Sequence, residues 1–188
     1  MPPLILASAS PRRSQLLHSA GISFVVLTAN TVELEADYLT PQEAAQINAY
    51  RKARAVAKQH PDNLVLGADT VVSLGNRFFG KPSSLTDARR MLTELQGQTH
   101  EVVTGVCLLH QRRHQERLFA VSTLVTLRAL SPRAIRDYLA RSHPLDKAGA
   151  YGIQEEGHLI VEAVDGSYSN VVGLPVREVQ AALAAWPV

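Results

Sequence analysis

One carboxylate interrupts an apolar stretch that has the composition of a buried strand. Asp69 lies in the segment 64–72, among leucine and valine side chains. A charged carboxylate is stable in such surroundings only if a metal ion, a cationic side chain or several hydrogen-bond donors pair with it. Gly67, two residues earlier, allows the backbone to bend or a ligand to approach closely. Asp69 is therefore a candidate reactive group. The alternative is a strand that ends at Ala68, with Asp69 and Thr70 capping a turn.

A second stretch joins a short apolar strand to the expected start of a helix. Residues 8–13 read Ser-Ala-Ser-Pro-Arg-Arg, with a serine suited to the N-cap and a proline suited to the first helical position. Ser8, Arg12 and Arg13 would add a hydroxyl and two guanidinium groups to a helix N-terminus, which already favours anions. The stretch predicts a phosphate site, although it lacks the glycines and lysine of a P-loop. The alternative is an ordinary capped helix with both arginines in solvent, but a basic first turn opposes the helix dipole unless an anion relieves it.

Three further charged side chains are candidates for a nucleotide site. Glu33 and Asp69 are candidate ligands of Mg²⁺, which on nucleotide phosphates typically takes one or two carboxylates and keeps several waters. Lys52 lies on an expected helix, and Lys81 lies in a loop between a glycine and a proline. Taken alone, Glu33, Lys52 and Lys81 are each more typical of a solvated surface charge.

The composition argues against several classes of protein. The formal net charge is +2 and only 5% of residues are aromatic, so we expect no extended nucleic-acid surface. Cys107 is the single cysteine, which argues against a thiolate zinc site and fits a reducing compartment. His100, His143 and His158 lack metal-ligand spacing, and we interpret them as structural. The first ten residues contain no basic leader and no long apolar core, so we expect a cytoplasmic protein without a membrane span.

Helical and strand patterns are interspersed along the whole chain. Strands are expected over 4–7, 23–27, 64–72, 101–110, 118–127 and 158–164, and helices over 11–20, 41–59, 86–95, 132–141 and 175–185. The segment 101–127 reads as a hairpin, and 74–77 reads as a turn. This pattern predicts an α/β protein with a mixed sheet. Its 188 residues are expected to form one domain with two lobes.

Several short motifs occur in order along nearly the whole chain. They are Ser-Ala-Ser-Pro-Arg-Arg at 8–13, Gly-Ala-Asp-Thr at 67–70, Gly-Lys-Pro at 80–82, Asp-Lys-Ala-Gly-Ala-Tyr-Gly-Ile-Gln at 146–154, Gly-Ser-Tyr at 166–168 and Val-Gly-Leu-Pro at 172–175. In this order and spacing they resemble the Maf family of nucleoside triphosphate pyrophosphatases. No single motif is specific, but the combination is.

The resemblance implies an enzyme that hydrolyses a nucleoside triphosphate to the monophosphate and pyrophosphate with a divalent cation, Mg²⁺ or Mn²⁺. It also implies an elongated mixed sheet flanked by helices, a central cleft between two lobes, and often a homodimeric state. Asp69 matches the position taken as general base. Positions tied to substrate choice match Arg12, Thr70 and Gln154, and other charged positions of the family's site match Glu33, Lys52 and Lys81.

The resemblance extends to a subgroup of the family, with two departures. Thr70 and the string Tyr-Gly-Ile-Gln at 151–154 are similar to the subgroup that acts on dTTP and UTP, and differ from the subgroup for 7-methyl-GTP. Glu155 stands where the family usually has a glycine, which alters the expected base-binding loop. Arg51 stands where a glutamate often precedes the lysine, which removes one candidate partner of Lys52.

The residues and the resemblance agree on one hypothesis. A cation on Glu33 and the triphosphate orients the substrate, Asp69 takes a proton from the water that attacks the α-phosphorus, and Gln154 reads a uracil or thymine ring. The cations expected to hold phosphate oxygens are Arg12, Arg13, Lys52 and Lys81. Asp69 as chiefly a metal ligand stays open. Two alternatives are the same chemistry on modified or purine nucleotides, and a non-enzymatic nucleotide- or nucleic-acid-binding protein linked to septum formation, which needs no Asp69.

Overall fold

The computed structural model describes residues 3–28, 31–34 and 38–187. Its strands are β1 (Leu4–Leu6), β2 (Phe24–Val26), β3 (Leu64–Leu74), β4 (Arg77–Phe79), β5 (Thr99–His110), β6 (Gln115–Leu127) and β7 (Val161–Asp165). They form one sheet in the order β2-β1-β3-β5-β6-β7, with β4 paired to β3. β1 runs parallel to β2 and β3, whereas the β3–β5, β5–β6 and β6–β7 pairs are antiparallel. The predicted mixed sheet and α/β class are confirmed.

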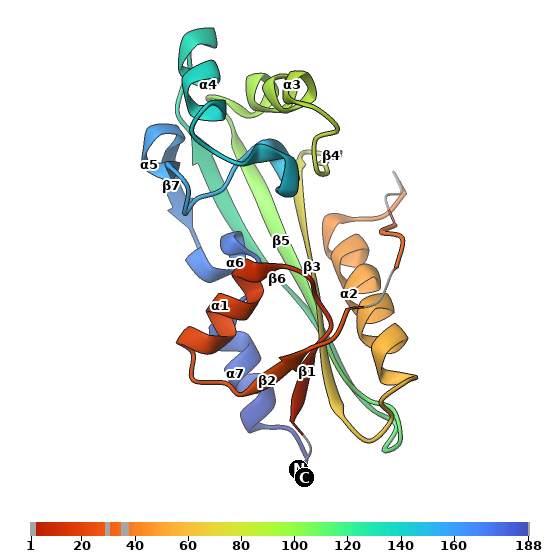
Figure 1. The fold of residues 1–188 in the computed structure, drawn as a ribbon. Helices are drawn as coiled ribbons and strands as arrows, with labels where there is room; N and C mark the ends of the chain where they lie inside the picture. The colour runs from red at the N-terminus through yellow and green to blue at the C-terminus, as the bar shows by residue number, and fades with distance from the viewer. Residues whose placement is uncertain (1–2, 29–30, 35–37, 188) are drawn as a thin grey trace.

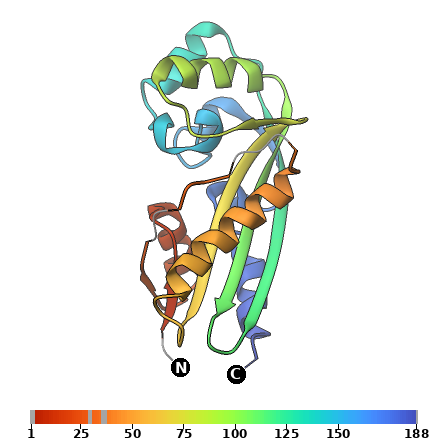
Figure 2. The same cartoon turned by 90° about the vertical axis from the view of Figure 1, so that its right-hand side faces the viewer.

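Helices cover both faces of this sheet and one of its ends. The helices are α1 (Pro11–Ser19), α2 (Pro41–Ala57), α3 (Leu85–Leu95), α4 (Pro132–Leu139), α5 (Gly157–Ile160), α6 (Tyr168–Val172) and α7 (Val176–Ala184), with 3₁₀ turns η1 (Pro144–Asp146) and η2 (Ala148–Ala150). The long strands β3, β5 and β6 run through the height of the molecule, with α2 on one face and α1 and α7 on the other (Figures 1 and 2). α3 and α4 lie at the upper end in Figure 1. The fold is therefore an elongated sheet with helices around it.

Three clusters of buried apolar side chains fill the spaces between these layers. One cluster lies between α2 and the sheet and is built from small residues, including Ala49, Ala53 and Cys107. Burial raises the pKa of the Cys107 thiol to about 12, so this cysteine is an inert core residue. A second cluster lies under α1 and α7, and the third joins α3 and α4 to the upper strands. The small residues under α2 let this helix approach the sheet closely.

The predicted helix starts are confirmed where the caps are visible in the sequence. Thr40 and Glu43 form a capping box on α2, because Thr40 Oγ1 accepts from the Glu43 N–H at 3.3 Å and Glu43 Oε2 accepts from the Thr40 N–H at 2.8 Å. Ser84 and Ser131 cap α3 and α4 with one hydrogen bond each, because their Oγ atoms accept from the Asp87 and Ala134 N–H groups at 3.1 Å. Each cap typically contributes about 1 kcal/mol to stability.

The alternative in which the strand ends at Ala68 is wrong. β3 continues to Leu74, and Asp69 lies in its interior, opposite Gly105 of β5. The carboxylate is tolerated there because its side chain meets polar partners above the sheet rather than the apolar core. Asp69 is therefore placed by a continuous, hydrogen-bonded strand.

Two other expectations about secondary structure need correction. The strand predicted over 158–164 begins only at Val161, because Glu156 takes a left-handed conformation at φ 54° and the next residues make the helical turn α5. This turn buries Ile160 in the core. The short helix α6 was missed because five residues are too few to show a helical period.

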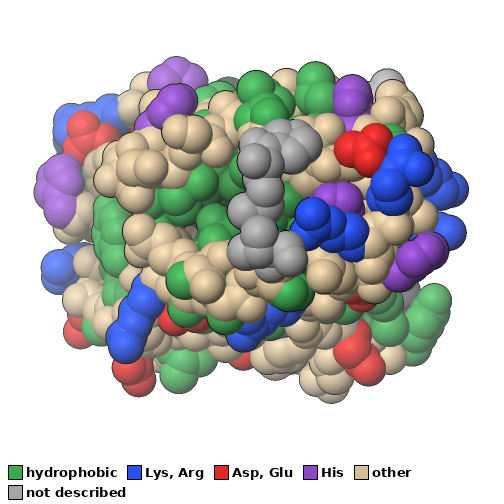
Figure 3. Space-filling view, turned by 90° about the horizontal axis from the view of Figure 1, so that it is seen from below, with side chains coloured by type: hydrophobic (Ala, Val, Ile, Leu, Met, Phe, Trp, Pro, Cys, Tyr) green, Lys and Arg blue, Asp and Glu red, His purple; other side chains and the backbone are tan. Residues whose placement is uncertain are grey.

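The surface view of the lower end shows basic, acidic and histidine side chains interspersed (Figure 3). Among the helices of the described ranges, none combines the length and the apolar character that crossing a membrane requires.

Candidate active site

A cavity of about 470 Å³ opens over the middle of β3. Its walls come from the start of α1, from α2, from the loop after β4 and from the segment 146–155 that contains the 3₁₀ turn η2. The side chains predicted for the site all line this cavity: Ser8, Arg12, Arg13, Glu33, Lys52, Asp69, Thr70, Lys81 and Gln154. The fold thus brings together residues that are far apart in the sequence, although it does not by itself assign their roles.

Asp69 is held on one side of the cavity by two donors from α2. Asp69 is only 5% exposed, and Lys52 Nζ donates to its Oδ1 at 2.6 Å. Asn48 Nδ2 donates to its Oδ2 at 3.1 Å. Asn48 and Lys52 lie four residues apart on α2, so they share the helix face that looks onto β3. Sequence reasoning missed Asn48; its spacing from Lys52 was the one available signal.

Lys52 is not a solvated surface lysine. Its ammonium also donates to Glu33 Oε1 at 2.8 Å, so it joins both predicted carboxylates. Partial burial alone would raise the pKa of Glu33, but the hydrogen bond and charge of Lys52, with further charges from Lys81 and Arg13, outweigh burial and lower that pKa. Glu33 is therefore ionised at neutral pH. Lys52 does not need a glutamate at position 51, where this chain has Arg51, because Glu33 and Asp69 are its partners.

Gly67 allows α2 to pack closely on β3, rather than allowing a ligand to approach. A Cβ atom at Gly67 would lie 2.3 Å from the Ala49 carbonyl oxygen, and one at Gly105 would lie 2.3 Å from the Ala45 carbonyl carbon. Only glycine fits at these two positions. The resulting close contact lets the short side chain of Asn48 reach Asp69.

Arg13 is buried, so the alternative with both arginines in solvent is wrong for this residue. Its Nε donates to the Gly173 carbonyl oxygen at 2.8 Å, its Nη1 to Ser8 Oγ at 3.0 Å and its Nη2 to Thr70 Oγ1 at 3.0 Å. Thr70 Oγ1 also lies 3.0 Å from Thr104 Oγ1. Arg13 therefore braces the floor of the cavity and fixes the Ser8 and Thr70 hydroxyls.

The start of α1 differs from the expected capped helix in one detail. Ser10 occupies the N-cap position, but in the structure as described its side chain makes no capping hydrogen bond. Its backbone N–H instead donates to Ser8 Oγ at 3.2 Å. The first turn of α1 thus presents N–H groups to the cavity without a side-chain cap, which suits an anion.

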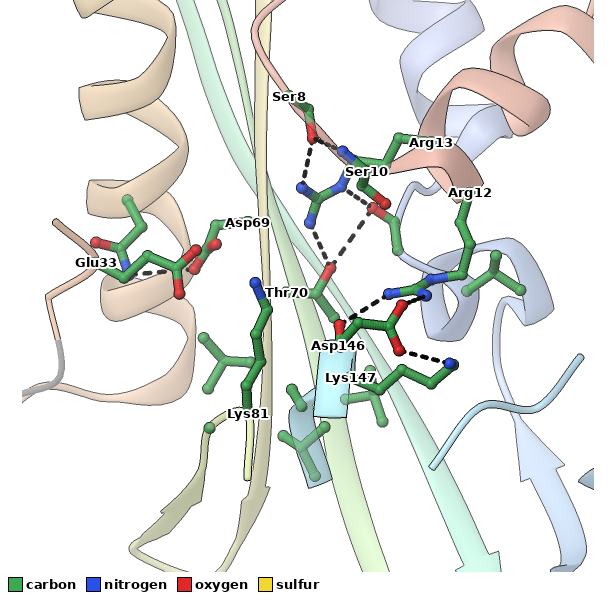
Figure 4. A pocket seen from close by; sticks show the side chains of 18 of the residues that line it. Ser8, Ser10, Arg12, Arg13, Glu33, Asp69, Thr70, Lys81, Asp146 and Lys147 are labelled. Atoms are coloured by element: carbon green, nitrogen blue, oxygen red, sulfur yellow. Dashed lines mark hydrogen bonds and ion pairs between the residues drawn. The ribbon is translucent and has the colours of Figure 1, made fainter. Parts of the chain in front are cut away.

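Arg12 reaches across the cavity to the segment 146–155. Its Nη1 donates to Asp146 Oδ2 at 2.6 Å and its Nη2 to the Asp146 carbonyl oxygen at 3.2 Å. Figure 4 shows Glu33 and Asp69 on one side of the cavity, Arg12, Asp146 and Lys147 on the other, and Lys81 pointing between them.

Lys147 is a buried cation that sequence reasoning did not single out. The residue is 4% exposed, and its Nζ contacts the His143 carbonyl oxygen at 2.6 Å, Asp146 Oδ1 at 2.7 Å and Glu155 Oε1 at 2.9 Å. Burial alone would raise the pKa of Glu155, but Lys147 and the His143 N–H bind its carboxylate and lower that pKa. The charge of Glu155 is thus held by Lys147, and the loop that carries Gln154 is closed by side-chain contacts.

The same loop is anchored to the upper core by two tyrosines. Tyr138 Oη accepts from the Gly152 N–H at 3.0 Å, and Tyr151 Oη lies 2.6 Å from His100 Nε2. Burial lowers the pKa of His100 to about 4, so the imidazole is neutral at neutral pH. His100 is structural, as expected, and supports the loop that carries Gln154.

The two carboxylates of the cavity fit a divalent cation that is bound by the protein and by the phosphates of a substrate. Glu33 Oε1 and Asp69 Oδ1 converge on one cationic atom, Lys52 Nζ, so they are placed to contact a single charge. Within the described ranges, no three His, Cys, Asp or Glu side chains gather as a metal site. Two carboxylates suit Mg²⁺ bound to phosphates, because that ion typically takes one or two protein carboxylates there.

Three comparisons with known proteins show the family and the fold of this chain. Residues 3–186 match the model of the Maf-like protein family. A dTTP/UTP pyrophosphatase of Gloeobacter violaceus is 49% identical over 171 residues, which cover 91% of this chain and 89% of that protein. One of Moorella thermoacetica is 46% identical over 188 residues, covering 100% and 97%. The solved structure of a HAM1 protein from Coxiella burnetii aligns with 99% of this chain and 100% of that one at a TM-score of 0.60, and at 14% identity it shows a shared fold.

Proposed function

The chain belongs to the Maf family, and from that premise we propose that it hydrolyses dTTP and UTP to the nucleoside monophosphate and pyrophosphate. One observation carries the chemistry: a buried carboxylate, Asp69, faces the N-terminus of α1 and several cations across one cavity. A protein that only bound nucleotides needs no Asp69, because without a bound cation a carboxylate buried beside the phosphate site repels the phosphates.

We propose that the phosphate end of the substrate lies between α1 and the loop after β4. The uncapped N–H groups of α1 favour an anion there, and Arg12 and Lys81 reach the same space. Arg13 acts on the phosphates chiefly by fixing Ser8, since its nitrogens already donate within the protein. In this proposal the triphosphate competes with Asp146 for Arg12 and with the two carboxylates for Lys52.

Asp69 is proposed to act as the general base. A water molecule attacks the α-phosphorus, its oxygen forms the new P–O bond, and its proton passes to an oxygen of Asp69. The bond from the α-phosphorus to the bridging oxygen breaks, and pyrophosphate leaves with that oxygen. Glu33 and Asp69 would hold a divalent cation, Mg²⁺ or Mn²⁺, which supplies charge neutralisation and orientation of the phosphates.

Gln154 is proposed to read the base. Its amide offers one donor and one acceptor, which match the adjacent carbonyl and imide N–H of uracil or thymine. Cytosine presents a different pattern on that edge, and a site built on such hydrogen bonds discriminates strongly when its polar groups go unpaired. The anchors at Tyr138 and Lys147 hold the loop in which Gln154 lies.

The test is hydrolysis of UTP in water enriched in oxygen-18. Attack at the α-phosphorus places the heavy oxygen in UMP, whereas attack at the β-phosphorus places it in pyrophosphate. We expect UMP and pyrophosphate as products, with the label in UMP. Products UDP and phosphate, or label in pyrophosphate, would contradict the proposal.

A further inference from the structure

The amide of Asn48 connects Asp69 to the backbone of the segment that carries Glu33, two parts of the site that Lys52 joins through side chains. Asn48 is 3% exposed, and its Nδ2 donates both to Asp69 Oδ2 at 3.1 Å and to the Leu34 carbonyl oxygen at 3.2 Å. Its Oδ1 accepts from the Leu34 N–H at 2.8 Å. We propose that Asn48 is a positioning residue for the hydrolysis: it fixes the plane of the Asp69 carboxylate and holds the segment that carries Glu33. The inference rests on the proposed function.

The orientation of this amide is set by the backbone. The Leu34 N–H needs an acceptor, and Oδ1 of Asn48 supplies it. If the amide were turned over, its NH₂ group would face that N–H, and its oxygen would face the Asp69 carboxylate. Both contacts would then be repulsive. The Leu34 backbone therefore turns Asn48 Nδ2 toward Asp69, and this orientation does not depend on Asp69 itself.

Asp69 receives one donor on each of its two oxygens. Lys52 contacts Oδ1 and Asn48 contacts Oδ2, and both donors project from the same face of α2. Two contacts on opposite oxygens restrain rotation of the carboxylate about its terminal bond more tightly than one contact does. Lys52 is also shared with Glu33 and is expected to turn toward a phosphate. Asn48 would still donate to Asp69 Oδ2 when Lys52 turns toward a phosphate.

The reach of Asn48 depends on the close packing of α2. Ala45 and Ala49 touch the sheet at Gly105 and Gly67, so the helix backbone lies near β3 on both sides of Asn48. Asn48 is itself 3% exposed, so a bulkier side chain would disturb this layer, and a shorter one leaves Asp69 without this donor. The glycines, the helix and the amide thus act together to place one carboxylate.

Misplacement of a base affects the chemical step more than binding. In the proposed function the phosphate and base contacts of the substrate come from side chains other than Asn48, so loss of Asn48 should leave KM nearly unchanged. A shift of about 1 Å in a reacting group can lower the rate on the order of 100-fold. The expected signature is therefore a fall in kcat alone.

The experiment compares two Asn48 variants with a matched control. Asn48→Leu keeps the number and branching of the side-chain heavy atoms but removes all three hydrogen bonds, and Asn48→Ala removes them without added bulk. Val56→Ala is the control, because Val56 is 3% exposed on the same helix and packs in the core cluster between α2 and the sheet. Pyrophosphate release from UTP gives kcat and KM, and thermal unfolding gives Tm for each protein.

We expect both Asn48 variants to lose kcat on the order of 10- to 100-fold, with KM within about threefold of wild type. Val56→Ala should lower Tm and keep kcat within about twofold. Folded Asn48 variants with wild-type kcat would overturn the inference, as would an equal loss of kcat in Val56→Ala. A wild-type protein that releases no pyrophosphate would overturn the proposed function and this inference with it. If the wild type is active, wild-type kcat in the Asn48 variants overturns this inference alone.

Discussion

Asp69 and Gln154 face the same cavity from supports of different construction. Asp69 lies inside an 11-residue strand that pairs with β5 along its length and lies under α2. Gln154 lies in an irregular turn that follows the 3₁₀ turn η2, two residues before Glu156, which has a positive φ. Backbone pairing places the first residue, whereas side-chain contacts from Lys147, Tyr138 and His100 place the second.

In the proposed function, this difference in support would separate chemistry from selectivity. A sheet position is hard to move with one side-chain substitution, because many backbone hydrogen bonds resist the shift. A loop that depends on a few polar contacts changes shape when one of them is lost. Substitutions at Asp69 should therefore change the rate on every nucleotide, whereas substitutions in the loop should change which nucleotide is preferred.

The largest effect is expected at Asp69. Asp69→Asn keeps the size of the side chain but removes the base, and loss of a positioned base typically lowers the rate on the order of 10² to 10⁴. We expect that loss in kcat on all substrates, with Tm close to wild type. Asp137→Asn makes the same change at an exposed site on α4 and serves as the control. Near wild-type kcat in Asp69→Asn would remove Asp69 from the mechanism.

Acid should weaken the loop side of the cavity through His100. Burial lowers the pKa of His100 to about 4 from an ordinary value of 6.5, so the unfolded chain takes up this proton first as the pH falls. The resulting contribution to stability is full above about pH 6.5 and decreases toward about pH 4, by on the order of 3 kcal/mol. Urea unfolding of wild type and His100→Gln between pH 4 and pH 7 measures it. Equal pH dependence in both proteins would contradict the assignment.

A smaller effect, on selectivity, is expected at Lys147. Lys147→Met leaves the carboxylates of Asp146 and Glu155 without their shared cation and loosens the loop. We expect kcat/KM for UTP to fall about tenfold, mainly through KM, and stability to fall by about 2 kcal/mol, since the partners stay partly exposed. Lys58→Met, at the exposed end of α2, is the control. A fall in kcat on every nucleotide without a change in selectivity would show that the loop serves the chemistry instead.

The sequence predicted most of the fold because its signals are local. Caps such as Thr40 with Glu43, and the polar turn of the β5–β6 hairpin, mark element boundaries directly. It missed α5 and α6 because each is too short to show a period. It predicted a strand over 64–72 with Asp69 inside it but left open a strand that ends at Ala68, since the register with β5 depends on a distant segment.

The candidate site was predicted less completely than the fold. Every side chain predicted for it lines the cavity, because the motifs and the resemblance to the family carried that information. Asn48 and Lys147 were not predicted as parts of the site, because their importance depends on partners such as Leu34 and Glu155 that only the fold brings near. The homodimer, the cytoplasmic location and the metal stay predictions.

The central proposal is that Asp69 serves the chemistry and Gln154 the selectivity. Its most direct test is the substrate profile of Gln154→Glu beside that of the wild type. Initial rates of pyrophosphate release are measured on dTTP, UTP, CTP, ATP, GTP and 7-methyl-GTP, with Mg²⁺ and with Mn²⁺. The wild type should prefer dTTP and UTP, and Gln154→Glu should slow these two far more than the poor substrates, because a carboxylate cannot donate to the base. A wild-type preference for a purine triphosphate, or an equal slowing of all nucleotides by Gln154→Glu, would contradict it.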